Sequence, residues 1–339
     1  MRYVSPVLCC RTLSLLSFGE NAKQFGDKKA LQGLSFQAPR GRTLAVLGPN
    51  GAGKSTTVNI LSTRTPPSSG KARVLGLDVV ADRAALRRKI AVVRQDACVD
   101  GFLNGRENLV VAAGLSGIPA AEARGRADRL LQRFDLVSAA GRRLEHYSGG
   151  MRRRLDLAVG LISQPALLFL DEPTTGLDPV SRQALWEIIR EIVAQGTDLI
   201  LTTQYLDEAD ALADDIVLVA DGRVLAQGTP SEMKALVGRN EHVEIVVLDA
   251  ADHRRAASIL AAHGALDVQI DAQRARLTAR NVAGPAALVP ILTRLELDGI
   301  DVEEVQIRRP TLDEAFHTLT TGTATAASTG PELAMGGTR

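Results

Sequence analysis

The sequence lacks the features that mark several classes of protein. No run approaches the roughly 20 uninterrupted apolar residues of a membrane-spanning helix, so we expect no segment to cross a bilayer. Three cysteines are too few for a disulfide framework, which favours a reducing cytoplasm. The five histidines show no metal-ligand spacing. A formal net charge of +1 argues against a strongly basic protein that coats nucleic acid.

The composition is that of an ordinary globular protein, with 45% hydrophobic and 23% charged residues, and a length of 339 residues predicts two domains. Residues 13–238 are predicted to form one α/β domain, because short apolar runs alternate with helical stretches. The runs indicate buried parallel strands. The predicted strands include 44–47, 90–93, 167–170 and 199–201, and the predicted helices include 54–62, 121–134, 151–163 and 180–195.

A turn signal at 238–240 separates a second predicted domain, residues 239–319, with a small α+β fold. Its predicted order is strand 242–248, helix 252–263, two short strands within 268–280, helix 285–297, strand 302–307 and helix 312–319. We expect residues 1–12 to be an N-terminal extension. Residues 320–339 contain few large apolar side chains and are expected to be disordered.

A glycine-rich loop follows the first of these apolar strands and opens a helix. The pattern G-x-x-x-x-G-K-[ST] is matched by Gly48-Pro49-Asn50-Gly51-Ala52-Gly53-Lys54-Ser55. Glycines let the backbone N–H groups face a phosphate, and the helix N-terminus adds a partial positive charge. Lys54 supplies a cation for the β- and γ-phosphates, and the Ser55 hydroxyl can ligate Mg²⁺. We expect this loop and the adjoining Thr56 to bind a nucleoside triphosphate.

Two carboxylates end a later apolar strand. Asp171 and Glu172 follow the run 167–170, at the strand end where α/β sheets place ligands. Asp171 is the predicted Mg²⁺ ligand, and Glu172 is the predicted general base that polarises an attacking water. Alone, such a pair would more often be two solvated acids; the phosphate-binding loop changes that interpretation.

Between these motifs lies Ser148-Gly149-Gly150, which precedes a helix. The order of motifs resembles that of the ATP-binding cassette (ABC) family, whose signature loop reads L-S-G-G-Q; here Tyr147 replaces the Leu and Met151 replaces the Gln. The resemblance implies a P-loop NTPase of the α/β class, with a helical signature subdomain and a small α+β C-terminal domain. It also implies an ATPase homodimer in which Ser148, Gly149 and Gly150 cap the γ-phosphate of ATP on the other subunit.

Further site residues follow from the same resemblance. Gln95 ends a predicted strand at the Q-loop position, which implies a contact with Mg²⁺ and a link to a membrane subunit. Asp178, in Gly-Leu-Asp-Pro, matches the D-loop. Phe25 matches the aromatic residue that stacks on adenine. From sequence alone, Phe25 would more often be a core residue, and the alignment with the family favours the stacking role.

The chain departs from the family at the switch loop, where most members carry a histidine. Gln204 stands there, within T-T-Q-Y-L-D-E-A-D. An amide can donate to a phosphate oxygen but cannot titrate. We therefore predict that Gln204 contacts the γ-phosphate or orients the water. This string resembles the ATP-binding subunits of daunorubicin/doxorubicin-type drug exporters.

The end of the second domain resembles the same subgroup, whose L-D-E-V-F motif corresponds to Leu312–Phe316 here. That motif implies coupling to the membrane partner, but a helix capped by Thr311 explains the same residues. Arg152, Arg153 and Arg154 are predicted to form a solvated helix face rather than to contact nucleic acid.

The resemblance implies the ATP-hydrolysing subunit of an export transporter, moving drugs or antibiotics, with ATP and Mg²⁺ bound. It would act at the cytoplasmic face of the cell membrane with a separately encoded transmembrane permease. The alternatives are a soluble ABC ATPase and a nucleotide-binding regulator, neither engaged in transport.

Overall fold

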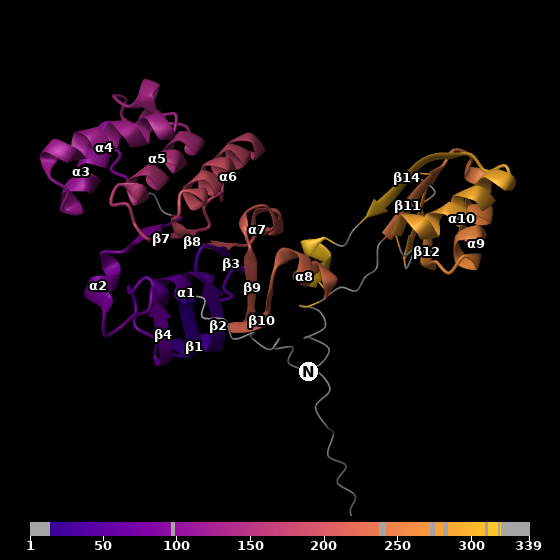
Figure 1. The fold of residues 1–339 in the computed structure, drawn as a ribbon, viewed down its shortest axis with the longest axis horizontal. Helices are drawn as coiled ribbons and strands as arrows, with labels where there is room; N and C mark the ends of the chain where they lie inside the picture. The colour runs from indigo at the N-terminus through magenta and orange to yellow at the C-terminus, as the bar shows by residue number, and fades with distance from the viewer. Residues whose placement is uncertain are drawn as a thin grey trace, which may run out of the picture. The chain divides into compact units, whose positions relative to one another are not determined.

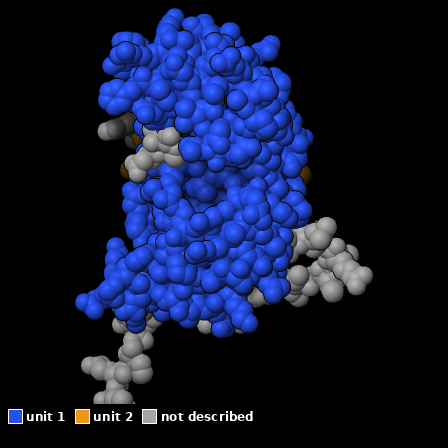
Figure 2. Space-filling model, turned by 90° about the vertical axis from the view of Figure 1, so that its left-hand side faces the viewer, with its two compact units in different colours: residues 1–230 blue, residues 231–339 orange. Residues whose placement is uncertain are grey.

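The computed structural model describes residues 14–95, 99–236, 242–271, 275–280, 284–308, 311–317 and 319 (Figure 1). The chain forms two compact units, residues 1–230 and 231–339 (Figure 2). The predicted domain boundary at 238, the N-terminal extension and the C-terminal tail fall outside the described residues. Among the helices described, none is both long and apolar enough to span a bilayer.

A six-stranded sheet forms the centre of unit 1. Its order is β10-β9-β3-β8-β7-β6, and every neighbouring pair is parallel except β10 with β9. All residues of three adjacent inner strands, β3, β8 and β7, are buried, which is why their apolar runs predicted parallel strands correctly. The strands are β3 (Thr43–Leu47), β6 (Ile90–Val93), β7 (Leu167–Asp171), β8 (Asp198–Thr203), β9 (Asp215–Ala220) and β10 (Arg223–Gly228).

A second, antiparallel sheet in unit 1 was not predicted from the sequence. It has the order β2-β1-β4-β5, formed by β1 (Ser14–Phe25), β2 (Lys28–Pro39), β4 (Ser69–Val74) and β5 (Leu77–Asp78). Side chains from this sheet, from helix α1 (Lys54–Leu61) and from the central sheet share one apolar core, which includes Phe18, Leu34, Ile60 and Val217. This shared core holds the strand end at Phe25 in the same unit as the loop after β3.

Among the described residues, the α-helices α3, α4 and α5 follow β6 and precede β7 in the chain, and they gather on the opposite side from the antiparallel sheet (Figure 1). Helix α5 packs closely on β6, since a Cβ at Gly160 would lie 2.7 Å from Val93 Cγ2. The helices of unit 1 are α1, α2 (Arg83–Arg87), α3 (Gly105–Leu115), α4 (Ala120–Arg133), α5 (Gly149–Leu161), α6 (Pro179–Ala194) and α7 (Leu206–Leu212). The predicted helices correspond to α1, α4, α5 and α6, with ends within two residues.

The run of three arginines in α5 is not a solvated face, so that prediction is wrong. Arg152 is exposed, but Arg153 is buried and Arg154 is half-buried. A helix that begins at Gly149 and packs on a sheet turns successive residues by about 100°, so three neighbours cannot share one environment.

Unit 2 contains a β-α-β-β-α-β arrangement of the ferredoxin-like type. Its four strands are all antiparallel and have the order β12-β13-β11-β14. Helices α9 and α10 contribute Leu260, Ile291 and Leu295 to its core. The elements are α8 (Pro230–Ala235), β11 (His242–Val247), α9 (His253–Ala262), β12 (Leu266–Asp271), β13 (Arg276–Arg280), α10 (Gly284–Leu297) and β14 (Val302–Arg308).

Residues 312–317 are helical, and the predicted cap at Thr311 is confirmed. The Thr311 hydroxyl accepts from the Glu314 N–H, and the Glu314 carboxylate accepts from the Thr311 N–H, each at 3.3 Å. This reciprocal pair is a capping box. Capping of this helix is therefore a structural role for both Thr311 and Glu314.

Candidate functional site

The loop between β3 and α1 wraps around a buried lysine. Lys54 is the first residue of α1, and its ammonium donates to the carbonyl oxygens of Gly48 at 2.8 Å and Pro49 at 3.2 Å. Gly53 has φ +105°, and a Cβ there would lie 2.7 Å from Leu31. Glycine is required at that position because L side chains disfavour both the conformation and the space. The backbone N–H groups at the start of α1 have no partner within the helix, so the loop can bind an anion.

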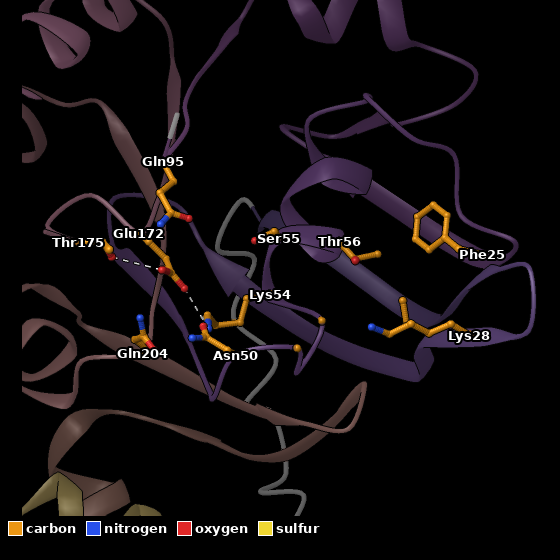
Figure 3. Close-up of a pocket in the computed structure, with 13 residues that line it drawn as sticks. Phe25, Lys28, Asn50, Lys54, Ser55, Thr56, Gln95, Glu172, Thr175 and Gln204 are labelled. Atoms are coloured by element: carbon orange, nitrogen blue, oxygen red, sulfur yellow. Dashed lines mark hydrogen bonds and ion pairs between the residues drawn. The ribbon is translucent and has the colours of Figure 1, made fainter. Parts of the chain in front are cut away.

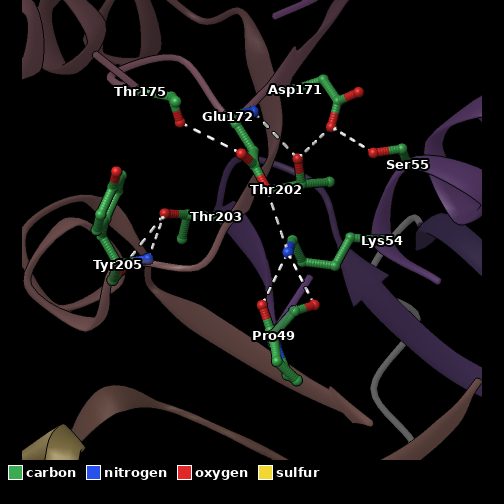
Figure 4. A network of polar contacts seen from close by, with 10 residues as sticks. Pro49, Lys54, Ser55, Asp171, Glu172, Thr175, Thr202, Thr203 and Tyr205 are labelled. Carbon is green, nitrogen blue, oxygen red and sulfur yellow. Dashed lines mark hydrogen bonds and ion pairs between the residues drawn. The ribbon is translucent and has the colours of Figure 1, made fainter. Parts of the chain in front are cut away.

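Asp171 ends β7 beside this loop. Its Oδ1 accepts from the Ser55 hydroxyl at 3.2 Å and from the Thr202 hydroxyl at 2.5 Å (Figure 4). The parallel pairing of β7 with β8 places Asp171 next to Thr202. Thr202 was not predicted as a site residue, although it lies in the string that contains Gln204.

Glu172 is oriented by contacts on both its backbone and its side chain. Its φ of +48° is rare for a residue with a side chain, and its N–H donates to the Thr202 carbonyl and hydroxyl, each at 3.1 Å. One carboxylate oxygen lies 3.2 Å from Lys54 Nζ, and the other accepts from the Thr175 hydroxyl at 3.2 Å (Figure 4). Thr202 therefore holds the strained backbone of Glu172, while Lys54 and Thr175 orient its carboxylate.

Lys54, Ser55 and Glu172 line an open cleft of about 580 Å³. Of the predicted site residues, Gly48, Pro49, Ala52 and Asp171 do not line it; Asp171 contacts the lining residue Ser55. Figure 3 shows Phe25 and Lys28 at one end, Glu172 and Gln204 at the other, and Lys54 with Ser55 between them. Lys28, Ala30 and Thr175 line it without having been predicted; Lys28 and Ala30 belong to a strand of the sheet that the sequence analysis missed. The lining residues are Phe25, Lys28, Ala30, Asn50, Gly51, Gly53, Lys54, Ser55, Thr56, Gln95, Glu172, Thr175 and Gln204.

Phe25 is a surface residue of this cleft rather than a core residue. Its side chain is 52% exposed at the end of β1, and Lys23 Nζ lies 5.0 Å from the ring centroid. A half-exposed aromatic ring held at a cleft edge can stack on a planar base.

Ser148, Gly149, Gly150 and Asp178 do not line this cleft. Ser148 caps α5, its hydroxyl accepting from the Met151 N–H at 3.2 Å, and Asp178 caps α6 by accepting from the N–H and hydroxyl of Ser181. The Ser181 hydroxyl and then its N–H hold the pKa of Asp178 below its usual range. A Cβ at Gly150 would lie 2.9 Å from Ser181 Oγ, so the first turns of α5 and α6 contact each other closely.

Comparisons with known proteins agree with this geometry. Residues 31–175 match the ABC transporter family. The daunorubicin resistance ATP-binding protein DrrA3 of Streptomyces coeruleorubidus is 47% identical over 298 residues, covering 88% of this chain and 93% of the relative. The Nod factor export ATP-binding protein I of Rhizobium sp. (strain N33) is 42% identical over 227 residues, 67% of this chain and 73% of the relative.

Among solved structures, cbiO1 from Clostridium perfringens, part of the ABC transporter complex cbiONQ, superposes with a TM-score of 0.61 and 29% identity. The match covers 66% of this chain and 91% of that one. The fold of unit 1 is therefore that of an ATP-binding subunit.

Proposed function

Because this chain belongs to the ABC transporter family and is an ATP-hydrolysing subunit, we propose that it drives drug export through a separate membrane permease. The cleft carries the proposal: a phosphate-binding loop, the Lys54 ammonium and the Glu172 carboxylate line it, Asp171 contacts Ser55 beside it, and an aromatic ring lies at the far end. The drug cargo is taken from the relatives, which are named for daunorubicin and doxorubicin resistance.

The order of side chains along the cleft suits a nucleoside triphosphate. Adenine would stack on Phe25, and the phosphates would follow the loop from Gly51 to Thr56 toward Gln204 at the other end (Figure 3). Lys54 lines the cleft within that loop, and its ammonium, which donates to the Gly48 and Pro49 carbonyls, would bind the β- and γ-phosphate oxygens.

The residues beside Lys54 fit a magnesium ion. Ser55 Oγ and Asp171 Oδ1 lie 3.2 Å apart, and hydroxyl and carboxylate oxygens are hard ligands of the kind Mg²⁺ prefers. They would hold the ion with Gln95, which lines the same cleft. When bound, Mg²⁺ neutralises charge on the phosphates.

Glu172 would act as the general base on the water that attacks the γ-phosphate. Its carboxylate is directed into the cleft by Lys54 and Thr175, so it is oriented without large movement. Gln204 would orient the same water or contact the γ-phosphate through its amide.

The signature loop would complete a site on a second copy of the chain. Ser148 and Gly150 begin helix α5 outside the cleft of their own subunit, and a helix N-terminus binds anions. Asp178 supports this loop through Ser181. A homodimer would then bind two ATP molecules, each between the phosphate-binding loop of one subunit and the signature loop of the other. This dimer would lie at the cytoplasmic membrane face, beneath the permease.

The test is ATP turnover by the purified chain, followed as phosphate release, against Glu172→Gln. We expect turnover to fall at least about 100-fold in the variant. Equal rates would reject the assignment of Glu172 and favour a nucleotide-binding regulator. Export is tested separately, by daunorubicin accumulation in cells that express the chain with and without a candidate permease; unchanged accumulation would reject the drug cargo.

A further inference from the structure

One arginine of helix α5 contacts the ends of two strands of the central sheet. Arg153 is buried, and its Nε donates to the Pro173 carbonyl at 2.6 Å. Its Nη2 donates to the carbonyls of Asp171 at 3.3 Å and Glu172 at 3.2 Å. Its Nη1 donates to the Arg94 carbonyl. One side chain therefore holds the backbone on either side of the general base and the residue before Gln95.

Only an arginine can make this set of contacts. Its planar guanidinium presents five N–H donors in a rigid fork, whereas a lysine ammonium is a single point. Hydrogen bonds from a charged donor are stronger than neutral ones, and a buried cation is costly unless its donors are satisfied. The carbonyls at the ends of β6 and β7 satisfy Arg153, so the helix cannot shift without moving them.

The position of Arg153 in its helix connects the signature loop with the backbone of Asp171 and Glu172. Helix α5 begins at Gly149, and Ser148 is its cap, so Arg153 lies in the second turn after the signature loop. In the dimer proposed above, that loop binds the nucleotide of the other subunit. The carboxylates of Asp171 and Glu172 serve the nucleotide of their own subunit.

We propose that Arg153 is a positioning residue that couples the two ATP sites of the dimer. Docking of the signature loop on one ATP fixes the first turns of α5, and the guanidinium transmits that position to the backbone of Glu172 and Arg94 at the other ATP. The inference rests on the proposed function. Only in the proposed dimer do the signature loop and the Glu172 backbone of one subunit contact two different ATP molecules.

A matched control lies next to Arg153 in the same helix. Arg154 also carries a guanidinium with backbone partners, but its Nη1 donates to the Phe134 carbonyl at 3.0 Å, at the end of α4 rather than at a strand end. Arg153→Gln and Arg154→Gln thus remove the same charge from the same helix. Arg153→Lys keeps the charge and removes only the fork.

The experiment measures phosphate release by the full chain across ATP concentration, ATP binding at equilibrium, and the melting temperature of each variant. For the wild type we expect a Hill coefficient above 1. For Arg153→Gln and Arg153→Lys we expect a Hill coefficient near 1 and a kcat about tenfold lower, with the Kd for ATP within about twofold. Arg154→Gln should keep the wild-type Hill coefficient. Guanidinium at millimolar concentration should partly restore kcat in Arg153→Ala.

The coupling role is overturned if both Arg153 variants keep the wild-type Hill coefficient, or if Arg154→Gln loses it equally. It is also overturned if the wild type itself shows a Hill coefficient of 1. A wild type whose turnover does not depend on Glu172 would instead reject the proposed function. The melting temperature shows whether Arg153→Lys, which keeps a buried charge, still folds. Rescue of Arg153→Ala by guanidinium is a second test that does not use the Arg153→Lys variant.

Discussion

Lys54 Nζ lies 3.2 Å from Glu172 Oε1, and both side chains are largely buried in the cleft. The same ammonium donates to the Gly48 and Pro49 carbonyls. The cation that would bind phosphate is thus also the partner of the group that would activate water. In a partly buried site such a pair is screened less than at the surface, so a change at one residue alters the other.

This pairing predicts that Glu172→Gln binds ATP more tightly than the wild type, in addition to losing turnover. A neutral amide no longer competes with the phosphates for the Lys54 ammonium, so we expect Kd to fall about threefold to tenfold. The measurement is an equilibrium titration with a fluorescent ATP analogue. Thr175→Val is the comparison, because it removes a hydrogen bond to Glu172 but leaves the carboxylate charge. Weaker binding by Glu172→Gln would show that the pair does not compete with phosphate.

Gln204 allows a test of what an amide does at the switch-loop position. We expect Gln204→Ala to lower kcat about tenfold, since one polar contact to the water or γ-phosphate is lost. Gln204→His should recover turnover and add an inflection near the ordinary histidine pKa of about 6.5 to the pH–rate profile. Tyr205→Phe is the control, because its backbone N–H, which donates to Thr203 Oγ1, is unchanged. Unchanged turnover in Gln204→Ala would remove Gln204 from the catalytic set.

The sequence predicted the central strands and the glycine-rich loop because both are local patterns. A strand buried on both faces is a continuous apolar run, as in β7, and the loop has a spacing that its chemistry requires. The antiparallel sheet was missed because its strands are not continuous apolar runs. Register shifts interrupt the two-residue period of β1, whereas β2 does alternate between buried and exposed residues, which is a signal that could have predicted it.

The missed contacts of the site are those set by tertiary packing. Arg153 belongs to a run of three arginines, and nothing in such a run shows which one faces the sheet. Thr202 contacts Asp171 only because β8 pairs in parallel with β7, a register that the chain specifies through long-range contacts. Local sequence patterns therefore predicted the residues that would bind and hydrolyse the nucleotide. The contacts that hold those residues in place, such as those of Arg153 and Thr202, became visible only in the structure.

Tyr147, which replaces the family's leucine, predicts a coupling with Gly105. The Tyr147 hydroxyl donates to the Ala139 carbonyl at 2.8 Å, and a Cβ at Gly105 would lie 2.2 Å from that hydroxyl. We expect Gly105→Ala and Tyr147→Leu each to lower the free energy of unfolding by about 1–3 kcal/mol. The double variant should lose less than the sum, because the leucine leaves room for the methyl group.

Denaturant unfolding of the four chains measures this coupling. Gly114→Ala is the control in the same helix, since its added Cβ would meet no atom within 4 Å beyond its chain neighbours and the nearby helix backbone, and it should raise stability by about 0.5–1 kcal/mol. Strictly additive losses would mean that the two residues do not share the space.

Glu208 predicts a pH dependence of stability. It is buried on α7, where the Trp186 indole N–H donates to Oε1 at 3.3 Å, and Oε2 has no hydrogen-bond partner among the described residues. Burial raises the pKa of this carboxyl above its ordinary value of 4.5, and Asp207 adds to the rise, against opposing contributions from the Thr203 and Thr174 hydroxyls. The folded protein therefore holds a proton that the unfolded chain releases.

As pH rises above 4.5, the unfolded chain loses this proton first, so the wild type loses stability until pH passes the raised pKa of Glu208. Glu208→Gln stays neutral and keeps an acceptor for the Trp186 indole. Its stability relative to the wild type should therefore increase from pH 4.5 upward and become level above the folded pKa. Melting temperatures across pH measure this difference, with exposed Glu187→Gln on α6 as the control that should follow the wild type. A constant gap between Glu208→Gln and the wild type at all pH values would show that Glu208 has the same pKa folded and unfolded.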